Sequence, residues 1–274
     1  MFGFTAKPEM GRRFFCVLGM VYITGSTGFL GSHLTKRLSD YLPIGHEHIQ
    51  TTPLNPFSYF YFLSAYGNMA THTGEEAIFK ANVEDLLSVL PRIKDFRFQS
   101  FVYMSTSSVR LKTQTTYSRS KRAAEEILLA FMERHDLPIC IIRPYSITGV
   151  GEQKEHLIPV LIDAAMTGKE INFVPDATHD FIDVEDVVDG IINLSHHSAR
   201  GIYELGTGKS YTNQEVLGIV EKVTGKRVKV NMVPSLRPYD NAQWISGNFR
   251  ARGFGWLPKK SLEQSIREMY ENAR

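Results

Sequence analysis

The feature that most constrains the fold is a set of three glycines spaced three apart, Gly25, Gly28 and Gly31. The run Val21–Thr24 before them is β-branched and aromatic, which predicts a buried strand. The segment after them repeats leucine every four residues from Leu30, which predicts an amphipathic helix. Such a strand–turn–helix unit directs free N–H groups and the positive end of a helix at one point. We therefore predict a pyrophosphate site here, although a plain strand-to-helix turn would also explain the three glycines alone.

Each glycine of this turn has its own expected role. Gly25 permits the sharp turn, because glycine tolerates a left-handed backbone. Gly28 lets the backbone approach the phosphates, and Gly31 lets the helix and the strand pack closely. The three positions together are those expected of a pyrophosphate-binding turn.

Composition excludes several classes of protein. The 274 residues are 43% hydrophobic and 22% charged, with a net charge of +2, which is typical of a globular protein with one large domain or two small ones. Basic residues are spread along the chain, so we expect no nucleic-acid partner and no polybasic membrane anchor. No apolar run approaches the roughly 20 residues that span a bilayer. The two cysteines, Cys16 and Cys140, form neither a disulfide framework nor a metal-ligand set. We predict a cytoplasmic protein without a metal.

Residues 1–19 do not belong to the pattern that follows. Arg12 and Arg13 precede a short apolar run, as in a signal peptide. The run is short, however, and the glycine-turn strand follows at once. We therefore predict an N-terminal extension, with Met20 as an alternative start.

The rest of the chain alternates strands with helices, which predicts a parallel, doubly wound sheet. The second half is more mixed. Strands are predicted at residues 57–64, 101–104, 137–143, 170–174, 181–184, 201–206 and 228–233. Helices are predicted at residues 75–93, 117–135, 156–167, 186–194 and 261–271, with another that begins at Thr212 and has Glu215 at capping-box distance.

The region after the first helix is unusual. A dinucleotide-binding unit has a second strand that ends in an acid, about 20 residues past the glycines, and this acid holds the adenosine ribose. The candidate strand, residues 46–51, ends in threonines and offers neither that acid nor an arginine. The next strand begins at residue 57, which leaves no room for a helix and another strand. We predict that the adenosine side of the fold is shortened.

The candidate catalytic residues are Thr106, Tyr117 and Lys121. Tyr117 and Lys121 are four apart on a predicted helix and therefore share a face. A free tyrosine titrates near pH ~10, and a neighbouring ammonium lowers this pKa. Tyr117 could then take a proton from a sugar hydroxyl while hydride leaves the same carbon. A Tyr-x-x-x-Lys pair also occurs by chance on solvated helices, but this one follows a glycine turn and a strand that ends in Ser and Thr.

These motifs, in this order, resemble the extended short-chain dehydrogenase/reductases, and in particular the NAD-dependent epimerase/dehydratase family. The resemblance runs from about Met20 to the C-terminus and includes Gly255-Trp256-Leu257-Pro258. It implies a Rossmann-like α/β fold with a smaller C-terminal substrate-binding lobe. The implied division is a dinucleotide-binding domain at residues 20–145, to which residues 181–200 return, and a lobe formed mainly by residues 146–274.

The resemblance also implies roles for individual residues. It implies NAD as the cofactor, with NADP as an alternative, and a nucleotide sugar as the substrate. Implied cofactor contacts are Gly25, Thr27, Gly28, Phe29, Leu30, Gly31, Ser64, Ala65, Asn82, Ser105, Tyr117, Lys121, Pro144 and Tyr145. Implied substrate contacts are Thr106, Ser146, His156, His179, Arg237 and Asp240.

Several positions depart from the family pattern. His179 stands where an arginine is usual, Arg110 replaces a tyrosine, and Ser146 and His156 replace asparagines. Dehydratases of the family place Asp and Glu after the threonine, whereas this chain has two serines there, at positions 107 and 108. Serine cannot do that acid–base work, so a 4,6-dehydratase is disfavoured.

Three functions remain open from the sequence. The first is an NAD-dependent sugar-nucleotide epimerase that acts at C4 of a UDP-hexose. The second is an NADP-dependent reductase of a keto-sugar or another carbonyl compound. The third is a non-catalytic member that binds a dinucleotide. In the family, helices equivalent to residues 75–93 and 117–135 pair between subunits, so we expect a homodimer.

Overall fold

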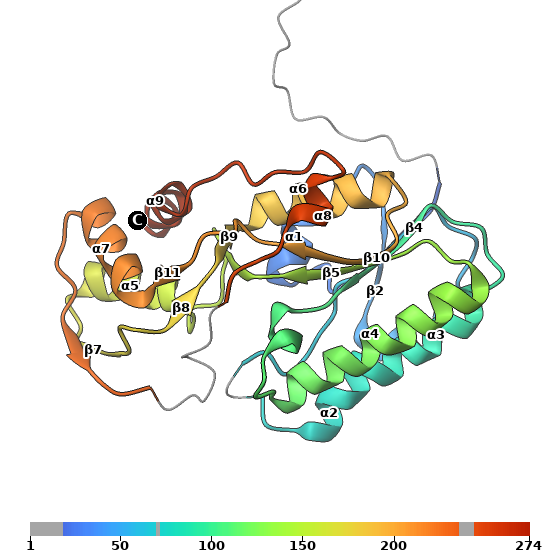
Figure 1. The fold of residues 1–274 in the computed structure, drawn as a ribbon, viewed down its shortest axis with the longest axis horizontal. Helices are drawn as coiled ribbons and strands as arrows, with labels where there is room; N and C mark the ends of the chain where they lie inside the picture. Colours follow the sequence, from blue (N-terminus) through green and yellow to red (C-terminus); the bar gives the residue numbers. More distant parts are fainter. Residues whose placement is uncertain (1–18, 70–71, 236–243) are drawn as a thin grey trace, which may run out of the picture.

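The structure, a computed structural model, describes residues 19–69, 72–235 and 244–274. Its central sheet contains the strands β1 (Val21–Thr24), β2 (Leu42–Ile44), β3 (Tyr59–Phe62), β4 (Ser100–Met104), β5 (Ile139–Pro144) and β10 (Gly201–Leu205). These strands lie in the order β10-β5-β4-β3-β1-β2, and each neighbouring pair is parallel (Figure 1). The chain passes from β1 to β2 on one side and then to β3 on the other. A parallel sheet binds ligands where its strand order reverses in this way, outside the carboxyl ends of the strands.

Helices cover both faces of the sheet, as the sequence predicted (Figure 1). One face packs against α1 (Phe29–Thr35) and α6 (Val184–His196) in a core that includes Leu34, Val187 and Ile191. The opposite face packs against α3 (Asp85–Ile93) and α4 (Thr116–His135) in a core that includes Leu86 and Leu128. Each fully buried leucine stabilises the fold by about 1.5–3 kcal/mol.

The helix predicted at residues 75–93 is one continuous helical segment in three parts. It consists of α2 (Glu75–Phe79), the π-helical turn η2 (Lys80–Glu84) and α3. A single π turn inside an α-helix rotates the side chains that follow it and is frequent at functional sites. Here the π turn contains the fully buried Asn82.

The prediction of the second strand was wrong. The strand is β2, residues 42–44, whereas residues 46–48 form a 3-10 helix, η1 (His46–His48). Pro43 lies opposite Ile23 on the outermost strand, where a missing N–H is tolerated. The expected shortening is confirmed, because the chain enters no further strand of the sheet between β2 and β3. The segment is instead held against α3, where Arg92 donates to the carbonyls of Ile49 at 2.9 Å and Thr52.

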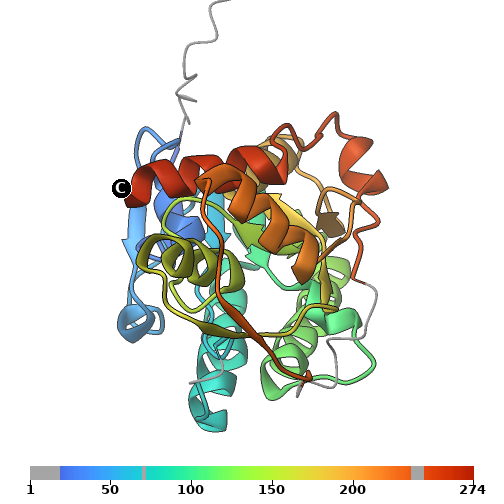
Figure 2. The same cartoon turned by 90° about the vertical axis from the view of Figure 1, so that its left-hand side faces the viewer.

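A smaller lobe packs beside the sheet around its own apolar core (Figures 1 and 2). Three helices surround this core, and its small strands form pairs rather than a large sheet. The helices are α5 (Leu157–Thr167), α7 (Asn213–Thr224) and α9 (Leu262–Ala273). The strand pairs are β6 (Ser146–Thr148) with β9 (Phe181–Asp183), β7 (Ile171–Phe173) with β12 (Val230–Met232), and β8 (Thr178–His179) with β11 (Tyr211–Thr212). The predicted capping box of Thr212 and Glu215 begins α7.

The chain returns to the main sheet through α6 and β10. The return includes residues 201–205, because β10 pairs with β5 at the edge of the sheet. The short helix α8 (Phe249–Arg252) follows, and its Ala251 joins the apolar core shared by α1 and α6. The part of the chain that returns to the main sheet therefore extends beyond the predicted segment 181–200 and includes β10.

Candidate active site

The glycine turn connects β1 to α1 at the switch point of the sheet. Gly25 has a φ of +70°, and a Cβ atom there would lie 2.8 Å from the backbone nitrogen of Ser64. A Cβ atom at Gly31 would overlap the carbonyl group of Gly25. At the exposed Gly28, a Cβ atom would meet the carbonyl oxygen of Gly25 only at 3.4 Å. The fold itself therefore requires two of the glycines, and the third leaves the backbone open to a ligand.

The other predicted residues of the turn lie beside Gly28. Thr27 is exposed, and Phe29 and Leu30 form the first turn of α1. No acidic side chain stands in that first turn. The N–H groups at the start of α1 are therefore not opposed by a carboxylate of the same turn, which suits an anion.

Thr24 joins the turn to the end of β3. Its hydroxyl oxygen accepts hydrogen bonds from the backbone nitrogens of Leu63 and Ser64, each at 3.1 Å, and from the Ser64 hydroxyl at 2.9 Å. Ser64 and the exposed Ala65 therefore leave β3 next to the glycines, as expected for two residues of one cofactor site. Thr24 was not among the predicted site residues, although it is the last residue of the strand before Gly25.

Asn82 supports this loop from the π turn. Its amide oxygen accepts from the backbone nitrogen of Tyr66 at 3.0 Å, and its amide nitrogen donates to the Tyr66 carbonyl at 2.8 Å. The same nitrogen donates to the Ser120 hydroxyl at 2.9 Å. Because protein groups engage both ends of the amide, Asn82 connects the loop to α4, which carries Tyr117 and Lys121.

The three candidate catalytic residues lie near adjoining strand and helix ends. Thr106 follows β4 and caps the 3-10 helix η3 (Ser107–Arg110), with its hydroxyl accepting from the Ser108 nitrogen at 3.2 Å. The same hydroxyl donates to the Ser108 hydroxyl at 3.1 Å. Tyr117 and Lys121 lie on the first turns of α4, which packs against η3.

Lys121 is fully buried, and its Nζ has no hydrogen-bond partner among the described residues. The Nζ atom lies 4.2 Å from the ring centroid of Tyr103, and burial lowers the pKa of Lys121 to about 7. An unpartnered buried amine is costly. It fits a ligand that brings acceptor oxygens, such as a ribose. With the open glycine turn, this residue makes the site compatible with a dinucleotide.

The pKa of Tyr117 differs from the sequence prediction. Burial raises it to about 12, whereas an effect of Lys121 was expected to lower it. The physical reason is desolvation, which disfavours the phenolate of Tyr117 and the ammonium of Lys121 alike. Burial therefore shifts both side chains toward their neutral forms.

An ion pair that was not predicted supports the same helix. Glu125, one turn after Lys121, is 1% exposed and accepts two hydrogen bonds from Arg143 on β5. Its Oε1 atom also accepts from the hydroxyl of Ser105 at 2.5 Å. Ser105, a predicted cofactor contact, is thereby joined to α4.

A second polar cluster lies at the end of β5. Pro144 is the last residue of the strand, and the buried Tyr145 follows it. The Tyr145 hydroxyl accepts from Arg110 Nη1 at 3.0 Å and donates to Glu204 at 3.2 Å. Burial, and secondarily the charge of Glu204, raise the pKa of Tyr145 to about 12. Arg110, which replaces the usual tyrosine, therefore holds Tyr145 against β10.

The predicted substrate residues separate into three places. Ser146 and His179 lie close together because Ser146 on β6 pairs with β9, which begins two residues after His179; the Ser146 hydroxyl is 3.4 Å from His179 Nδ1. His156 precedes α5 and pairs with Glu152 at 3.0 Å. Arg237 and Asp240 lie outside the described residues.

Asp180 is a buried residue that the sequence analysis did not single out. Its carboxylate accepts from the backbone nitrogens of Thr207 at 2.8 Å, Gly208 at 2.9 Å and Ser246 at 3.0 Å. It therefore ties the strand next to His179 to the glycine turn after β10. Its position directly after the predicted substrate contact His179 was the available sequence signal.

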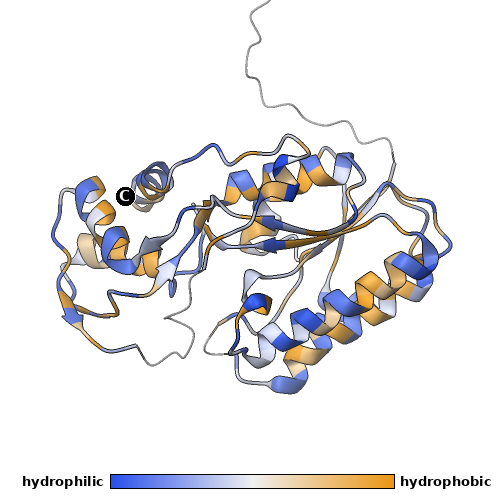
Figure 3. Ribbon diagram, viewed as in Figure 1, coloured by the Kyte–Doolittle hydropathy of each residue, from blue (hydrophilic) through white to orange (hydrophobic). Residues whose placement is uncertain are grey.

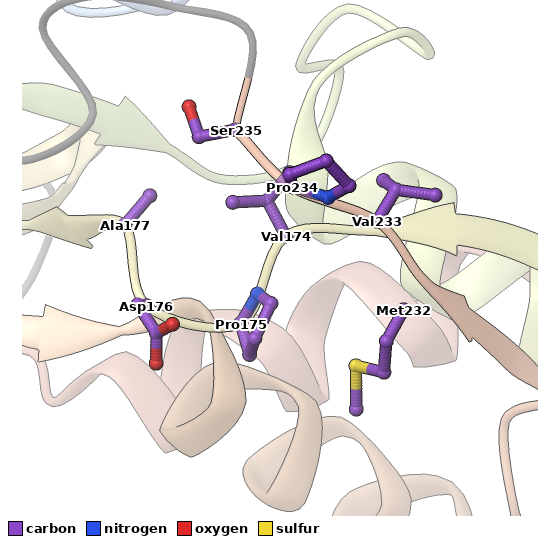
Figure 4. A pocket seen from close by; sticks show the side chains of 8 residues that line it. All are labelled: Val174, Pro175, Asp176, Ala177, Met232, Val233, Pro234 and Ser235. Atoms are coloured by element: carbon purple, nitrogen blue, oxygen red, sulfur yellow. The ribbon is translucent and has the colours of Figure 1, made fainter.

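A pocket of about 430 Å³ opens in the smaller lobe (Figure 4). Residues 174–177 form one wall and residues 232–235 the other. None of its lining residues was predicted as a site residue, but Ala177 precedes His179 by two positions and Ser235 precedes Arg237 by two. The pocket therefore adjoins, along the chain, the segments that carry predicted substrate contacts.

Comparison with known proteins gives the same family as the motifs. The model of the NAD dependent epimerase/dehydratase family matches residues 54–206, which is more than half of the chain. The UDP-glucose 4-epimerase of Rhizobium leguminosarum bv. trifolii is 23% identical over 92% of this chain and 96% of the relative.

Solved structures agree with the fold. The UDP-glucose 4-epimerase of Thermus thermophilus, in complex with NAD, has a TM-score of 0.80 at 19% identity, with 92% of this chain and 98% of that chain covered. RMD from Pseudomonas aeruginosa, complexed with NADPH, has a TM-score of 0.81 at 17% identity, with 93% and 100% covered. The family match and the glycine turn together lead to one conclusion: this chain belongs to the NAD dependent epimerase/dehydratase family and is an NAD-dependent enzyme of the short-chain dehydrogenase/reductase type.

Proposed function

We propose that this protein is an NAD-dependent nucleotide-sugar 4-epimerase that acts on a UDP-hexose. The observation that carries the proposal is the buried Nζ of Lys121, one helical turn after Tyr117 on α4, which has no hydrogen-bond partner in the part of the chain that the structure describes. An amine in this state needs acceptor oxygens from a ligand. The name of the Rhizobium relative, a UDP-glucose 4-epimerase aligned with nearly the whole chain, supports this substrate class.

The residues divide the chemistry between them. NAD, when bound, supplies the acceptor for a hydride. Tyr117 takes the proton of the sugar hydroxyl, and the Thr106 hydroxyl holds the oxygen that loses it. Because burial raises the pKa of Tyr117 to about 12, its phenolate depends on a charged Lys121 nearby. An epimerase would not consume NAD, because the hydride would return to the other face of the carbon while Tyr117 would return the proton to the oxygen.

The serines after Thr106 favour epimerisation over elimination of water. The hydroxyl of Ser108 accepts from Thr106 at 3.1 Å and from Ser118 at 2.9 Å. Ser107 is buried beside it. A serine hydroxyl does not titrate near neutral pH, so neither residue can replace the acid and base of a dehydratase. The hydroxyl chain is instead suited to orient Thr106.

The substrate's nucleotide is proposed to lie toward the smaller lobe. Ser146 and His179 adjoin there, and the pocket of residues 174–177 and 232–235 is close along the chain. Arg237, next to this pocket in sequence, stays a predicted contact of the diphosphate, and Asp240 stays a predicted contact of the substrate. His156 also stays a predicted contact of the substrate, although its Nδ1 atom is already paired with Glu152.

The test is the Tyr117→Phe variant assayed for interconversion of UDP-glucose and UDP-galactose. We expect turnover to fall by about 10²–10⁴-fold, the usual contribution of a general base. Mass spectrometry of the denatured variant should still detect its nicotinamide cofactor. Tyr270→Phe on α9 is the matched control and should keep full turnover. Full turnover by Tyr117→Phe would overturn the proposed mechanism.

A second candidate is an NADP-dependent reductase of a keto-sugar. The absence of an acid at the end of β2 favours it, because that acid is what commonly selects NAD. Stoichiometric consumption of NADPH would identify a reductase, whereas an epimerase recycles its cofactor. Cofactor binding without turnover of any nucleotide sugar would instead identify a non-catalytic member.

Assembly and location follow the same family reasoning. We propose a homodimer formed through α2, α3 and α4, where Phe79 and Leu87 are 42% and 43% exposed. None of the helices in the described ranges is sufficiently long and apolar to cross a membrane. The buried free thiol of Cys140 is compatible with a reducing compartment, and a cytoplasmic location stays a prediction.

A further inference from the structure

We propose that Gly45 occupies the position that contacts the adenosine ribose of the cofactor, and that the dinucleotide site therefore accepts NADP as well as NAD. The inference rests on the proposed dinucleotide site. The sequence did not indicate Gly45, because the second strand was predicted at residues 46–51, whereas β2 ends at Ile44, directly before Gly45.

The sheet register fixes the place of Gly45. Ile44 is the parallel partner of Thr24, and the next residues, Gly45 and Gly25, leave the sheet at the same edge. Gly45 is twenty residues past Gly25. In dinucleotide-binding sheets, an acid about 20 residues past the glycines binds the ribose 2′-hydroxyl and so selects NAD. Here the residue at that place has no side chain.

The fold does not require a glycine at this position. Gly45 has φ −69° and ψ 149°, an extended conformation open to any residue. A Cβ atom would approach one described side chain, His48, and only at 3.8 Å from its Cδ2 atom. The residue is exposed. The space beside it is therefore available to a 2′-phosphate, and a substitution there should leave the fold intact.

The residues that follow do not create an acidic site. His46 forms an ion pair with the buried carboxylate of Asp85 on α3 and is thereby drawn toward that helix. Glu47 and His48 complete η1 and are both exposed. The single carboxylate of Glu47, between the imidazoles of His46 and His48, does not repel a phosphate strongly. Glu47 is the one alternative acid within residues 42–48, and the experiment must test it separately.

The experiment measures Kd for NAD and for NADP by isothermal titration calorimetry on the purified full chain. For the unmodified protein we expect the two constants to agree within about fivefold. Gly45→Asp should weaken NADP relative to NAD by at least about tenfold, because a carboxylate repels the phosphate and accepts from the hydroxyl. Gly45→Ala and Glu47→Gln are the controls, and both should keep the unmodified ratio.

The outcomes separate this inference from the proposed function. Selective binding of NAD, by more than about tenfold, would overturn the inference and leave the epimerase proposal standing. If the unmodified protein selects NAD and Glu47→Gln loses this selectivity, Glu47 is the residue that binds the ribose, and the inference about Gly45 is also overturned. If Gly45→Ala changed the ratio of the two Kd values as much as Gly45→Asp does, the charge of the side chain at this position would not be what determines the choice of cofactor. Saturable binding of neither cofactor would refute the dinucleotide site, and both proposals would fail together.

Discussion

Arg143 donates two parallel hydrogen bonds to Glu125, from Nε to Oε1 at 2.9 Å and from Nη2 to Oε2 at 2.5 Å. The pair joins β5 to the buried side of α4, and Glu125 also holds Ser105 at the end of β4. A buried ion pair is costly to form but much more costly to break, because the remaining charge is left uncompensated.

Glu125→Gln should therefore destabilise the protein by about 3 kcal/mol. The amide cannot neutralise Arg143 or accept in the same bidentate way. Urea denaturation of the variant measures the loss, and Glu126→Gln, an exposed neighbour on the same helix, should change stability little. A Glu125→Gln variant as stable as the parent would mean that water or another group compensates Arg143.

Lys121 should reduce stability while it supports function. Burial lowers its pKa to about 7, so between about pH 7 and pH 10 the unfolded chain binds a proton that the folded chain does not. The free energy of unfolding therefore rises with pH in this window. Lys121→Met should be inactive, more stable by roughly 1–2 kcal/mol at pH 7, and less dependent on pH.

Urea denaturation at about pH 7 and pH 9.5 measures this effect. Arg122→Met, an exposed neighbour on α4, is the control for adding an apolar side chain to the helix. If Lys121→Met keeps the pH slope of the parent, another group is responsible for it.

His33 should give stability the opposite pH dependence. Its Nδ1 pairs with Glu185 at 2.5 Å and its Nε2 with the Val150 carbonyl at 2.8 Å, so both ring nitrogens face acceptors. The hydrogen bond to Glu185 is the main reason that the pKa of His33 is raised. Its stabilisation is therefore complete below the pKa of the unfolded histidine and is lost as pH rises through the raised value.

His33→Gln should consequently cost about 1 kcal/mol near pH 6 and less at alkaline pH. The same pairing lowers the pKa of Glu185, so the cost should also shrink as pH falls through that lowered value. Thermal unfolding across pH 4–9 gives the profile, with the exposed His48 substituted to Gln as control. A cost independent of pH would point to packing against Phe29 instead.

Two parts of the candidate site could be proposed from the sequence because each follows a short local pattern. The turn from Gly25 to Gly31 and the pair Tyr117–Lys121 each lie within one strand–helix unit, where spacing alone determines the shared face. The role of Glu125 could not be predicted, because its partner Arg143 lies on β5 and only the packing of α4 against that strand brings the two together. β2 was misplaced for a related reason. Its three residues include Pro43, and pairing with β1 rather than its own composition makes it a strand.

The proposed dimer predicts which exposed apolar residues matter. Phe79 and Leu87 lie on α2 and α3, and the ribbons of α3 and α4 contain further hydrophobic residues along this layer (Figure 3). Helices α3 and α4 already bury one face against the sheet. A second copy of the chain is therefore expected to pack against the apolar residues that stay exposed. Replacing Phe79 and Leu87 together by Glu should convert a dimer to a monomer, which sedimentation velocity would detect. Phe249, 73% exposed on α8, is the matched control, and Phe249→Glu should leave the dimer intact. A monomeric parent protein, or a double variant that stays dimeric, would show that these helices do not form the interface.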